Sequence, residues 1–336
     1  MLLNNRYRIL RSLGRGGFGE TFLAEDTYLP SSRPCVIKQL KPMANNPQPQ
    51  LIQDRFQREA AVLEQLGEGH SQIPKLYAYF SENDQFYLVQ EWIEGQTLTD
   101  KIRQQGIQSE TAVREILVSL LHILDYVHNQ RIIHRDIKPD NIILRQRDSQ
   151  PVLIDFGAVK EAIATAFNPQ GNSVHSMVIG TPGFMSPEQA TGRPVYSSDL
   201  YSLGLTAIYL LTGKLPQELG LDPQTGEIIW RQIAVGVSPS LATVLDRAIQ
   251  PRPIHRYATP REMLDALQLA SPTSAAMPVT QPTLAVSPVA PRPVHPGFSP
   301  KTVPAIQSPA RQGQIGERRV GKECLRLCRS RWSPYH

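Results

Sequence analysis

The stretch Ile133–Leu144 reads IHRDIKPDNIIL: a histidine, an arginine, two aspartates, a lysine and an asparagine precede an unbroken apolar run. Catalytic side chains tend to lie in loops that a rigid scaffold holds. A polar loop joined to an apolar strand in this way is therefore more typical of a reaction centre than of a spacer. Its chemistry then depends on the residues that the rest of the chain brings to it.

The length and composition are those of a folded protein with one large domain or two small ones: 336 residues, 40% of them hydrophobic. The net charge of +5 belongs to the C-terminal part, because residues 271–336 carry nine Lys and Arg against two Glu, which leaves −2 for residues 1–270. The basic character therefore gives no reason to expect a specific nucleic-acid partner.

Three features favour a cytoplasmic protein without a transmembrane segment. The chain does not start with basic residues followed by an apolar stretch, so no secretory signal is expected. The longest apolar stretch, Leu200–Leu211, is shorter than the ~20 residues that span a bilayer and is predicted to be a buried core helix. Three cysteines provide no disulfide framework, and Cys35 is predicted to be a small core residue in a reducing compartment.

Residues 7–40 alternate short strand-like runs with turn residues, which predicts an antiparallel β start. Gly14, Gly16 and Gly19 form a G-x-G-x-x-G pattern between two of these strands. The dinucleotide-binding form of this pattern requires a helix after the glycines, whereas residues 21–24 continue as a strand. A glycine-rich hairpin whose backbone amides close over phosphates fits better, and an ordinary glycine turn is the alternative.

Lys38 ends the predicted strand that starts at residue 35, soon after the glycine hairpin. Residues 54–67 are predicted to form a helix with one apolar stripe, and Glu59 lies near that stripe. Lys38 is thus a candidate to neutralise phosphate oxygens, and Glu59 is a candidate to point at Lys38. A solvated lysine and a surface carboxylate are the alternatives.

The pattern changes from β-rich to α-rich near residue 95. Further strands are predicted at residues 86–93 and 151–154, and helices from about Ser109 to the opening stretch and at residues 199–212, 241–249 and 260–269. The second of these strands ends at Asp155-Phe156-Gly157. This order predicts two lobes with a cleft that the glycine hairpin and the polar loop both face.

Eight landmarks follow one another in order: Gly14-x-Gly16-x-x-Gly19, Lys38 in Cys-Val-Ile-Lys, Glu59, His134-Arg135-Asp136 with Asn141, Asp155-Phe156-Gly157, Ser186-Pro187-Glu188, Asp199 and Arg256. In these motifs, over about residues 7–270, the sequence resembles the protein kinases, specifically the bacterial eukaryotic-like (Hanks-type) serine/threonine kinases. The resemblance implies an α+β fold of two lobes: a small antiparallel β-rich N-lobe with one key helix, about residues 7–93, and a larger α-helical C-lobe, about residues 96–270.

The resemblance also implies roles in transferring the γ-phosphoryl group of ATP to a protein hydroxyl. Asp136 would orient the acceptor hydroxyl and accept its proton, and Lys138 would contact the transferred phosphate. Lys38 would hold the upstream phosphates while Glu59 fixes Lys38. Lys138 is also the lysine that tyrosine-specific members usually lack, so the resemblance favours serine and threonine as acceptors.

ATP and Mg²⁺ are the cofactors that the resemblance implies, with Mn²⁺ as the alternative ion. Asn141 and Asp155 would supply the hard oxygen ligands that magnesium prefers. The ATP-binding residues would be Leu13, Gly14, Arg15, Gly16, Gly17, Phe18, Gly19, Thr21, Val36, Lys38, Gln90, Glu91, Ile93 and Ile143. Thr21 and Val36 stand where the family has valine and alanine, small changes to the adenine roof with which ATP is still expected to fit.

Residues 88–93 resemble the hinge between the lobes. Gln90 would be the gatekeeper, and the backbones of Glu91 and Ile93 would bind adenine. Glu188 and Arg256 would form a structural ion pair, with Ser-Pro-Glu in place of the family's Ala-Pro-Glu. Asp199 would anchor the catalytic loop, and Leu63, His134 and Phe156 would belong to the apolar spine of active kinases.

Residues 158–183 are polar and weakly patterned, as in a long mobile functional loop. Arg135, just before the catalytic aspartate, places the chain in the group that loop phosphorylation often switches. The expected phosphate acceptors are Thr165, Ser173 and Ser176. Thr181 is expected to contact Asp136 and Lys138 instead.

Beyond about residue 270 the helical pattern stops. Residues 271–312 are rich in Pro and Ser, as in a disordered linker, and the sharper alternative is a regulatory arm that docks a partner. Residues 313–336 are Arg-rich, and two readings stay open: a basic appendage for anionic surfaces, or a segment that is not a natural continuation of the chain.

The leading hypothesis is an active protein serine/threonine kinase in signalling that also phosphorylates itself. A catalytically dead kinase that acts as a scaffold is the second hypothesis, and the intact Lys38, Asp136, Asn141 and Asp155 argue against it. A small-molecule kinase of the same fold is the third. The long loop that ends in Ser-Pro-Glu, together with Lys138, argues against that reading.

Overall fold

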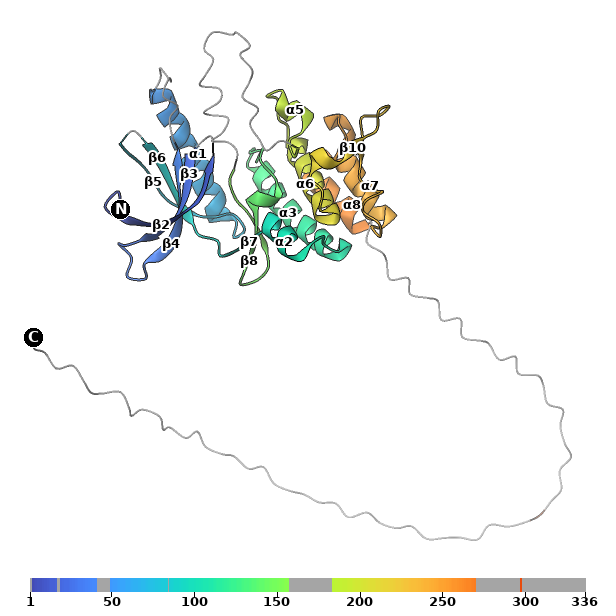
Figure 1. The fold of residues 1–336 in the computed structure, drawn as a ribbon, viewed down its shortest axis with the longest axis horizontal. Helices are drawn as coiled ribbons and strands as arrows, with labels where there is room; N and C mark the ends of the chain where they lie inside the picture. Colours follow the sequence, from blue (N-terminus) through green and yellow to red (C-terminus); the bar gives the residue numbers. More distant parts are fainter. Residues whose placement is uncertain are drawn as a thin grey trace, which may run out of the picture. The chain divides into compact units, whose positions relative to one another are not determined.

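The computed structural model describes residues 2–16, 19–40, 49–83, 85–156, 183–269 and 297 (Figure 1). It divides into two units, residues 1–276 and 277–336, and all of the helices and strands described below belong to the first. None of the helices in the described part of the chain combines the length and the apolar character needed to cross a membrane. The apolar stretch at residues 200–211 instead lies in a buried helix.

The N-lobe is an antiparallel sheet of six strands in the order β1-β2-β3-β4-β6-β5. The strands are β1 (Leu2–Leu3), β2 (Tyr7–Gly16), β3 (Gly19–Asp26), β4 (Arg33–Leu40), β5 (Leu76–Glu82) and β6 (Gln85–Glu91). Alternation along the strands places Ala24, Cys35, Ile37 and Val89 together in a small core on one face of the sheet. Cys35 is a core residue, as predicted, and burial raises the pKa of its thiol to about 11.

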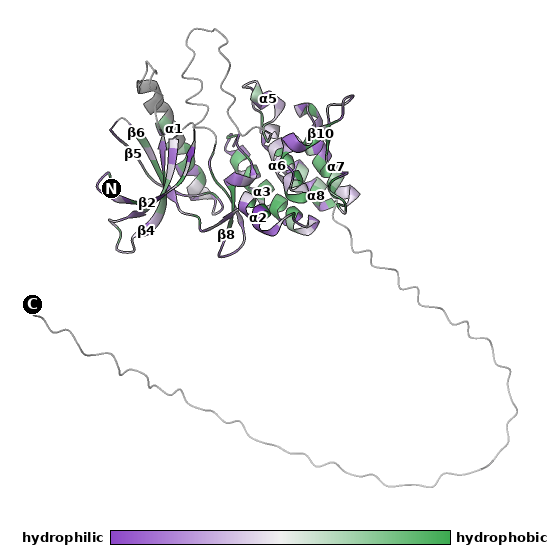
Figure 2. Cartoon of the chain, in the orientation of Figure 1, coloured by the Kyte–Doolittle hydropathy of each residue, from purple (hydrophilic) through white to green (hydrophobic). Residues whose placement is uncertain are grey.

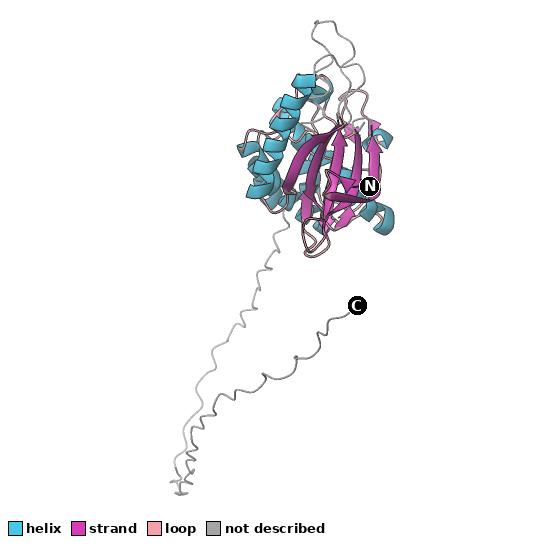
Figure 3. Cartoon of the chain, turned by 90° about the vertical axis from the view of Figure 1, so that its left-hand side faces the viewer, coloured by secondary structure: helices cyan, strands magenta, loops and turns pink. Residues whose placement is uncertain are grey.

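The key helix of the N-lobe is α1 (Pro49–Gly69), which starts earlier than the predicted residue 54. Proline is well tolerated in the first turn of a helix, where its missing N–H has no helical partner in any case. The predicted stripe of Phe56, Ala60, Leu63 and Leu66 is buried. The Phe56 ring lies 5.0 Å from that of Phe86, which packs the helix against the sheet (Figure 3).

The C-lobe is mainly helical, as the resemblance implied. Its helices are α2 (Leu98–Gln105), α3 (Glu110–Asn129), α5 (Pro187–Ala190), α6 (Tyr196–Thr212), α7 (Pro239–Ala248) and α8 (Pro260–Leu269), with 3₁₀ turns η1 (Pro139–Asn141), η2 (Pro216–Glu218) and η3 (Pro253–His255). Ser109 caps α3 by accepting a hydrogen bond from the Ala112 N–H. Hydrophobic residues gather along α3, α6, α7 and α8 (Figure 2). Helices α3 and α7 each pack against both α6 and α8.

Short strands complete the C-lobe. Strands β7 (Gly95–Thr97), β8 (Ile142–Arg145) and β9 (Pro151–Leu153) form a three-stranded sheet, and the opening stretch ends within its central strand β8. A hairpin of β10 (Gly220–Leu221) and β11 (Ile228–Ile229) was not predicted. At its turn, the Asp222 carboxylate accepts hydrogen bonds from the N–H groups of Gln224 and Thr225.

Candidate active site

The polar loop brings three of the expected catalytic and metal-binding residues into contact. The Asp136 side chain is 3% exposed, and its Oδ2 lies 3.3 Å from the Lys138 Nζ. The Asn141 side-chain amide donates to both the carbonyl and Oδ2 of Asp136, each at 2.8 Å. Because the amide nitrogen of Asn141 bonds to Asp136, its amide oxygen is the atom of that side chain that can bind a cation.

A buried aspartate from α6 holds the backbone of this loop. Arg135 adopts a left-handed conformation with φ of +68°, which is uncommon for residues other than glycine. The completely buried Asp199 accepts hydrogen bonds from the N–H groups of His134 and Arg135, both at 2.9 Å, and contacts the Nε2 of His128 at 2.8 Å. This geometry agrees with the anchor role expected of Asp199.

Asp199 is ionised despite its burial. Burial alone would raise the pKa of this carboxyl, but the hydrogen bond from His128 and the nearby donors hold the pKa below its ordinary value. Burial lowers the pKa of His134, so that ring is neutral at neutral pH. The charged Asp199 carboxylate therefore holds the backbone N–H groups of His134 and Arg135, while the His134 ring itself is neutral.

Lys38 and Asp155 meet although they are far apart in sequence. The Lys38 Nζ lies 3.0 Å from Oδ1 of Asp155, and their side chains are 19% and 37% exposed. Asp155 is left-handed, with φ of +63°. The Ile154 N–H donates to the Asn141 carbonyl at 2.9 Å, which ties the backbone next to Asp155 to the residue expected to share its cation.

The oxygen donors at this place fit a magnesium ion that also binds phosphates. Magnesium usually takes one or two protein side-chain ligands and completes its shell with water and phosphate oxygens. Asp155 and Asn141 provide such a pair. Among the described residues, no group of three or more His, Cys, Asp and Glu lies in a place to hold a metal ion.

The glycine pattern forms a hairpin rather than a strand–helix turn. Strands β2 and β3 pair as far as Gly16 and Gly19, where φ of Gly19 is +152°. Gly17 and Phe18 lie outside the described residues. Arg15, expected at the ATP site, forms an exposed ion pair with Glu20 at 2.8 Å.

Most of the remaining ATP-site candidates lie on strands of the N-lobe sheet, whereas Ile93 follows β6 and Ile143 lies on β8. Thr21 pairs with Lys38, and Val36 pairs with Gln90. Gln90 and Ile93 are buried, whereas Leu13, Thr21, Val36, Glu91 and Ile143 are half-buried. The Glu91 N–H donates to the Lys75 carbonyl at 2.9 Å, so the Glu91 carbonyl is the hinge group at this residue that can accept from adenine.

Several expected side chains lie outside the described part of the structure. Glu59 belongs to α1, but its side chain lies outside the described part of the structure, so its expected contact with Lys38 stays a prediction. The described partner of Lys38 is Asp155. The regulatory residues Thr165, Ser173, Ser176 and Thr181 also lie outside the described residues.

The expected spine residues lie in the hydrophobic core. Leu63 and Phe156 are buried in one cluster, and the rings of His134 and Phe156 lie 4.5 Å apart. The His134 Nε2 also lies 3.2 Å from the Ile154 carbonyl. The catalytic loop and the segment that carries Asp155 are thereby joined by packing as well as by hydrogen bonds.

Glu188 and Arg256 form a bidentate ion pair, with N–O distances of 2.7 and 2.9 Å. The Arg256 side chain is 0% exposed and stacks its guanidinium 4.6 Å from the centre of the Tyr201 ring. Burial opposes ionisation of Glu188, yet the hydrogen bonds from Arg256 and Ser198 lower its pKa to about 2. The pair links the segment before α6 to the loop after α7.

Sequence reasoning missed two residues that contact this framework. His128, in the last turn of α3, bonds to Asp199, and Gln189 of α5 donates its side-chain amide to the Arg135 carbonyl. The only sign in the sequence that Gln189 matters is its position directly after Ser-Pro-Glu. Its partner Arg135 lies 54 residues earlier in the sequence, so no local pattern predicts the contact.

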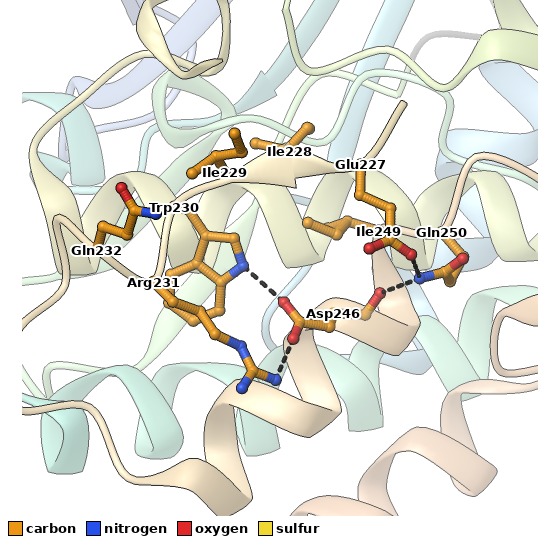
Figure 4. Close-up of a pocket in the computed structure, with 9 residues that line it drawn as sticks. All are labelled: Glu227, Ile228, Ile229, Trp230, Arg231, Gln232, Asp246, Ile249 and Gln250. Atoms are coloured by element: carbon orange, nitrogen blue, oxygen red, sulfur yellow. Dashed lines mark hydrogen bonds and ion pairs between the residues drawn. The ribbon is translucent and has the colours of Figure 1, made fainter. Parts of the chain in front are cut away.

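A cavity of about 200 Å³ lies between the β11 strand and the end of α7, lined by Glu227–Gln232, Asp246, Ile249 and Gln250 (Figure 4). None of these is an expected site residue. The Trp230 indole donates to the Asp246 carboxylate at 2.7 Å, and Arg231 pairs with the same carboxylate. Gln250 donates to Glu227 at 2.9 Å. These polar groups bond to one another, which gives them a structural role.

Comparison with known proteins gives consistent matches. A family model described as "Protein kinase domain" matches residues 7–265. Serine/threonine-protein kinase PknA of Nostoc sp. is 67% identical over 269 residues, which cover 80% of this chain and 48% of that protein. Serine/threonine-protein kinase C of Synechocystis sp. is 61% identical over 268 residues, which cover 80% of this chain and 50% of that protein.

Among solved structures, the PknI kinase domain of Mycobacterium tuberculosis has a TM-score of 0.61 at 26% identity, covering 80% of this chain and 98% of that one. The chain spans about half the length of the curated relatives described above.

Proposed function

Because this chain belongs to the protein kinase family, with a catalytic domain of the bacterial Hanks type, we propose that it transfers the γ-phosphoryl group of ATP to serine and threonine hydroxyls of proteins. The observation that carries the proposal is the cluster in which the buried Asp136 carboxylate contacts both Lys138 and Asn141. These are the groups that phosphoryl transfer needs beside the acceptor hydroxyl.

The proposed mechanism assigns each group one task. Asp136 orients the acceptor hydroxyl and accepts its proton, while Lys138 neutralises charge on the transferred phosphoryl group. Lys38 holds the upstream phosphates. Asn141 and Asp155 would hold Mg²⁺, which neutralises phosphate charge when it is bound with ATP, and Mn²⁺ suits the same oxygen ligands.

Other parts of the ATP site are proposals too. Glu59 would fix Lys38 once the Lys38 Nζ leaves Asp155 to a cation, an exchange that fits the partial exposure of the present pair. The glycine hairpin would cover the phosphates. Adenine would accept a hydrogen bond from the Ile93 N–H and donate one to the Glu91 carbonyl, next to the gatekeeper Gln90.

The test is phosphate transfer from labelled ATP to a generic protein substrate, followed by identification of the phosphorylated residue. Phosphoserine or phosphothreonine is expected. Asp136→Asn should abolish transfer and keep MgATP binding, whereas Asp265→Asn, the same change on the exposed face of α8, should keep full activity. Binding of MgATP by the unmodified chain without any transfer would instead favour a catalytically dead scaffold. Transfer only to small molecules would favour a small-molecule kinase of the same fold.

We also propose that phosphorylation controls the activity. Arg135 would pair with a phosphate on Thr165, Ser173 or Ser176, and Thr181 would contact Asp136 and Lys138. Mass spectrometry after incubation with MgATP tests this switch. A fully active enzyme without phosphate on residues 158–183 would refute it.

The segment after residue 270 and the location of the protein remain proposals. Residues 271–312 are proposed as a linker, with partner docking as the sharper alternative. Residues 313–336 are proposed as a basic tail of doubtful origin, either an appendage for anionic surfaces or a segment that is not a natural continuation of the chain. Deletion of residues 271–336 with unchanged activity and partner binding would dispose of a docking role. The low cysteine content supports a reducing cytoplasm, and the charge of −2 on residues 1–270 argues against a nucleic-acid partner.

A further inference from the structure

The peptide bond that enters the catalytic aspartate is held at both ends. It joins the Arg135 carbonyl to the Asp136 N–H, and a peptide unit is planar. The Asp136 N–H donates to the Nδ1 of His134 at 3.3 Å, and the Arg135 carbonyl accepts from the side-chain amide of Gln189. A planar unit fixed at both ends fixes the direction in which the Asp136 side chain leaves the backbone.

This peptide bond also follows an unfavourable conformation. Arg135 is left-handed, so the loop needs contacts that stop it from relaxing toward a more common conformation. Asp199 supplies one such contact at the Arg135 N–H, at 2.9 Å. Gln189 supplies a contact at the carbonyl of the same residue.

Gln189 is itself well anchored. It lies in α5, next to Glu188, whose ion pair with the fully buried Arg256 has N–O distances of 2.7 and 2.9 Å. Ser198 adds a hydrogen bond to the Glu188 carboxylate at 2.6 Å. The backbone that carries Gln189 is therefore fixed to α6 and to the loop after α7.

We propose that Gln189 is a positioning residue for the reaction: its amide holds the Arg135–Asp136 peptide bond and so couples α5 to the placement of the catalytic carboxylate. The proposal rests on the proposed function, in which Asp136 orients the acceptor hydroxyl. A loss of this hydrogen bond leaves the binding residues for ATP in place. It therefore affects the rate of transfer rather than the affinity for nucleotide.

Gln189→Met tests the proposal, because methionine has a similar length and a good helix propensity but no N–H donor. Gln108→Met is the matched control, since Gln108 also donates its side-chain amide to a backbone carbonyl, that of Gly106 at 2.7 Å, in an exposed turn. In the full chain, Gln189→Met should lower kcat about tenfold, which equals about 1.4 kcal/mol, with the KM for ATP within about twofold. Gln108→Met should change neither value.

A kcat within twofold of the unmodified enzyme would overturn the proposal, as would a rise of KM for ATP in proportion to the loss of kcat. If Gln189→Met does not fold, Gln189→Glu removes the donor at constant shape, and the same two outcomes apply. Hydrogen exchange at the Asp136 amide separates this proposal from the proposed function. Faster exchange in Gln189→Met than in Gln108→Met is expected even if no transfer occurs, and equal exchange rates in the two variants would overturn the coupling.

Discussion

Replacing Glu188 by glutamine is expected to lower the free energy of unfolding by about 3 kcal/mol. The carboxylate contacts Arg256 through two hydrogen bonds, and its pKa falls from an ordinary value of 4.5 to about 2. Each pKa unit corresponds to about 1.36 kcal/mol, which gives the expected magnitude. Removing one partner of a buried ion pair typically costs about 3–5 kcal/mol, so the two routes agree.

The sign of the pH dependence follows from the direction of the shift. Because folding lowers the pKa of Glu188, its contribution to stability is complete above about pH 4.5 and is lost as the pH falls toward about 2. The loss in stability of the unmodified protein between these values should therefore be about 3 kcal/mol larger than that of Glu188→Gln. At pH 7 the variant should melt about 6–12 °C lower.

Urea unfolding of the full chain, followed by circular dichroism at pH 7 and at several values down to pH 2, measures both effects. The double variant Glu188→Leu/Arg256→Met removes both charges and should be more stable than Arg256→Met, which leaves a buried carboxylate unpaired. A cost below about 1 kcal/mol for Glu188→Gln at pH 7 would refute the reasoning. An equal acid sensitivity of the variant and the unmodified protein would do the same.

Three further variants test other contacts. Lys38→Met should lower the rate of phosphate transfer at least ~100-fold, measured by kinetics. Because the ion pair of Lys38 with Asp155 is partly exposed, the free energy of unfolding should change by less than about 1 kcal/mol in urea unfolding, and a larger loss of stability would contradict the prediction. Asp199→Asn should cost about 3 kcal/mol, since an amide cannot replace a charged acceptor for the N–H groups of His134 and Arg135; a melting temperature unchanged within 2 °C would show that the anchor is unimportant. Trp230→Phe loses the 2.7 Å hydrogen bond to Asp246 and fills less of a buried site, so about 2 kcal/mol is expected in urea unfolding, and a neutral effect would contradict the structural role of the residues around the cavity.

The sequence was most informative where the signal is local. The stripe of Phe56, Ala60, Leu63 and Leu66 repeats at helical spacing, so the buried face of α1 could be predicted. The β2–β3 hairpin could be predicted from its glycines, because the chain continues as a strand after them. The start of α1 was placed five residues late, although Ile52 lies four residues before Phe56 in the sequence and continues the helical spacing of the stripe.

Contacts between distant segments could not be derived from spacing. The β10–β11 hairpin has strands of only two residues each, too short for alternation to appear. The resemblance indicated that Lys38, Asp136 and Asp155 act together, but the direct contact of Lys38 with Asp155 depends on how the lobes fold against each other. Gln189 and His128 were missed because each bonds to a residue more than fifty positions away.

The burial of α6 from Ser197 onward is expected to make the two parts of the site unfold at different temperatures. Every residue from Ser197 to Thr212 is buried, so the amides of this helix should exchange with solvent only when the whole C-lobe opens. Asp199 ties the catalytic loop to that helix, whereas Lys38 lies on β4 and the glycine pattern joins β2 to β3, three strands that share the smaller core of the N-lobe. On heating, nucleotide binding should therefore be lost at a lower temperature than the one at which the catalytic loop and the Asp136 carboxylate become disordered.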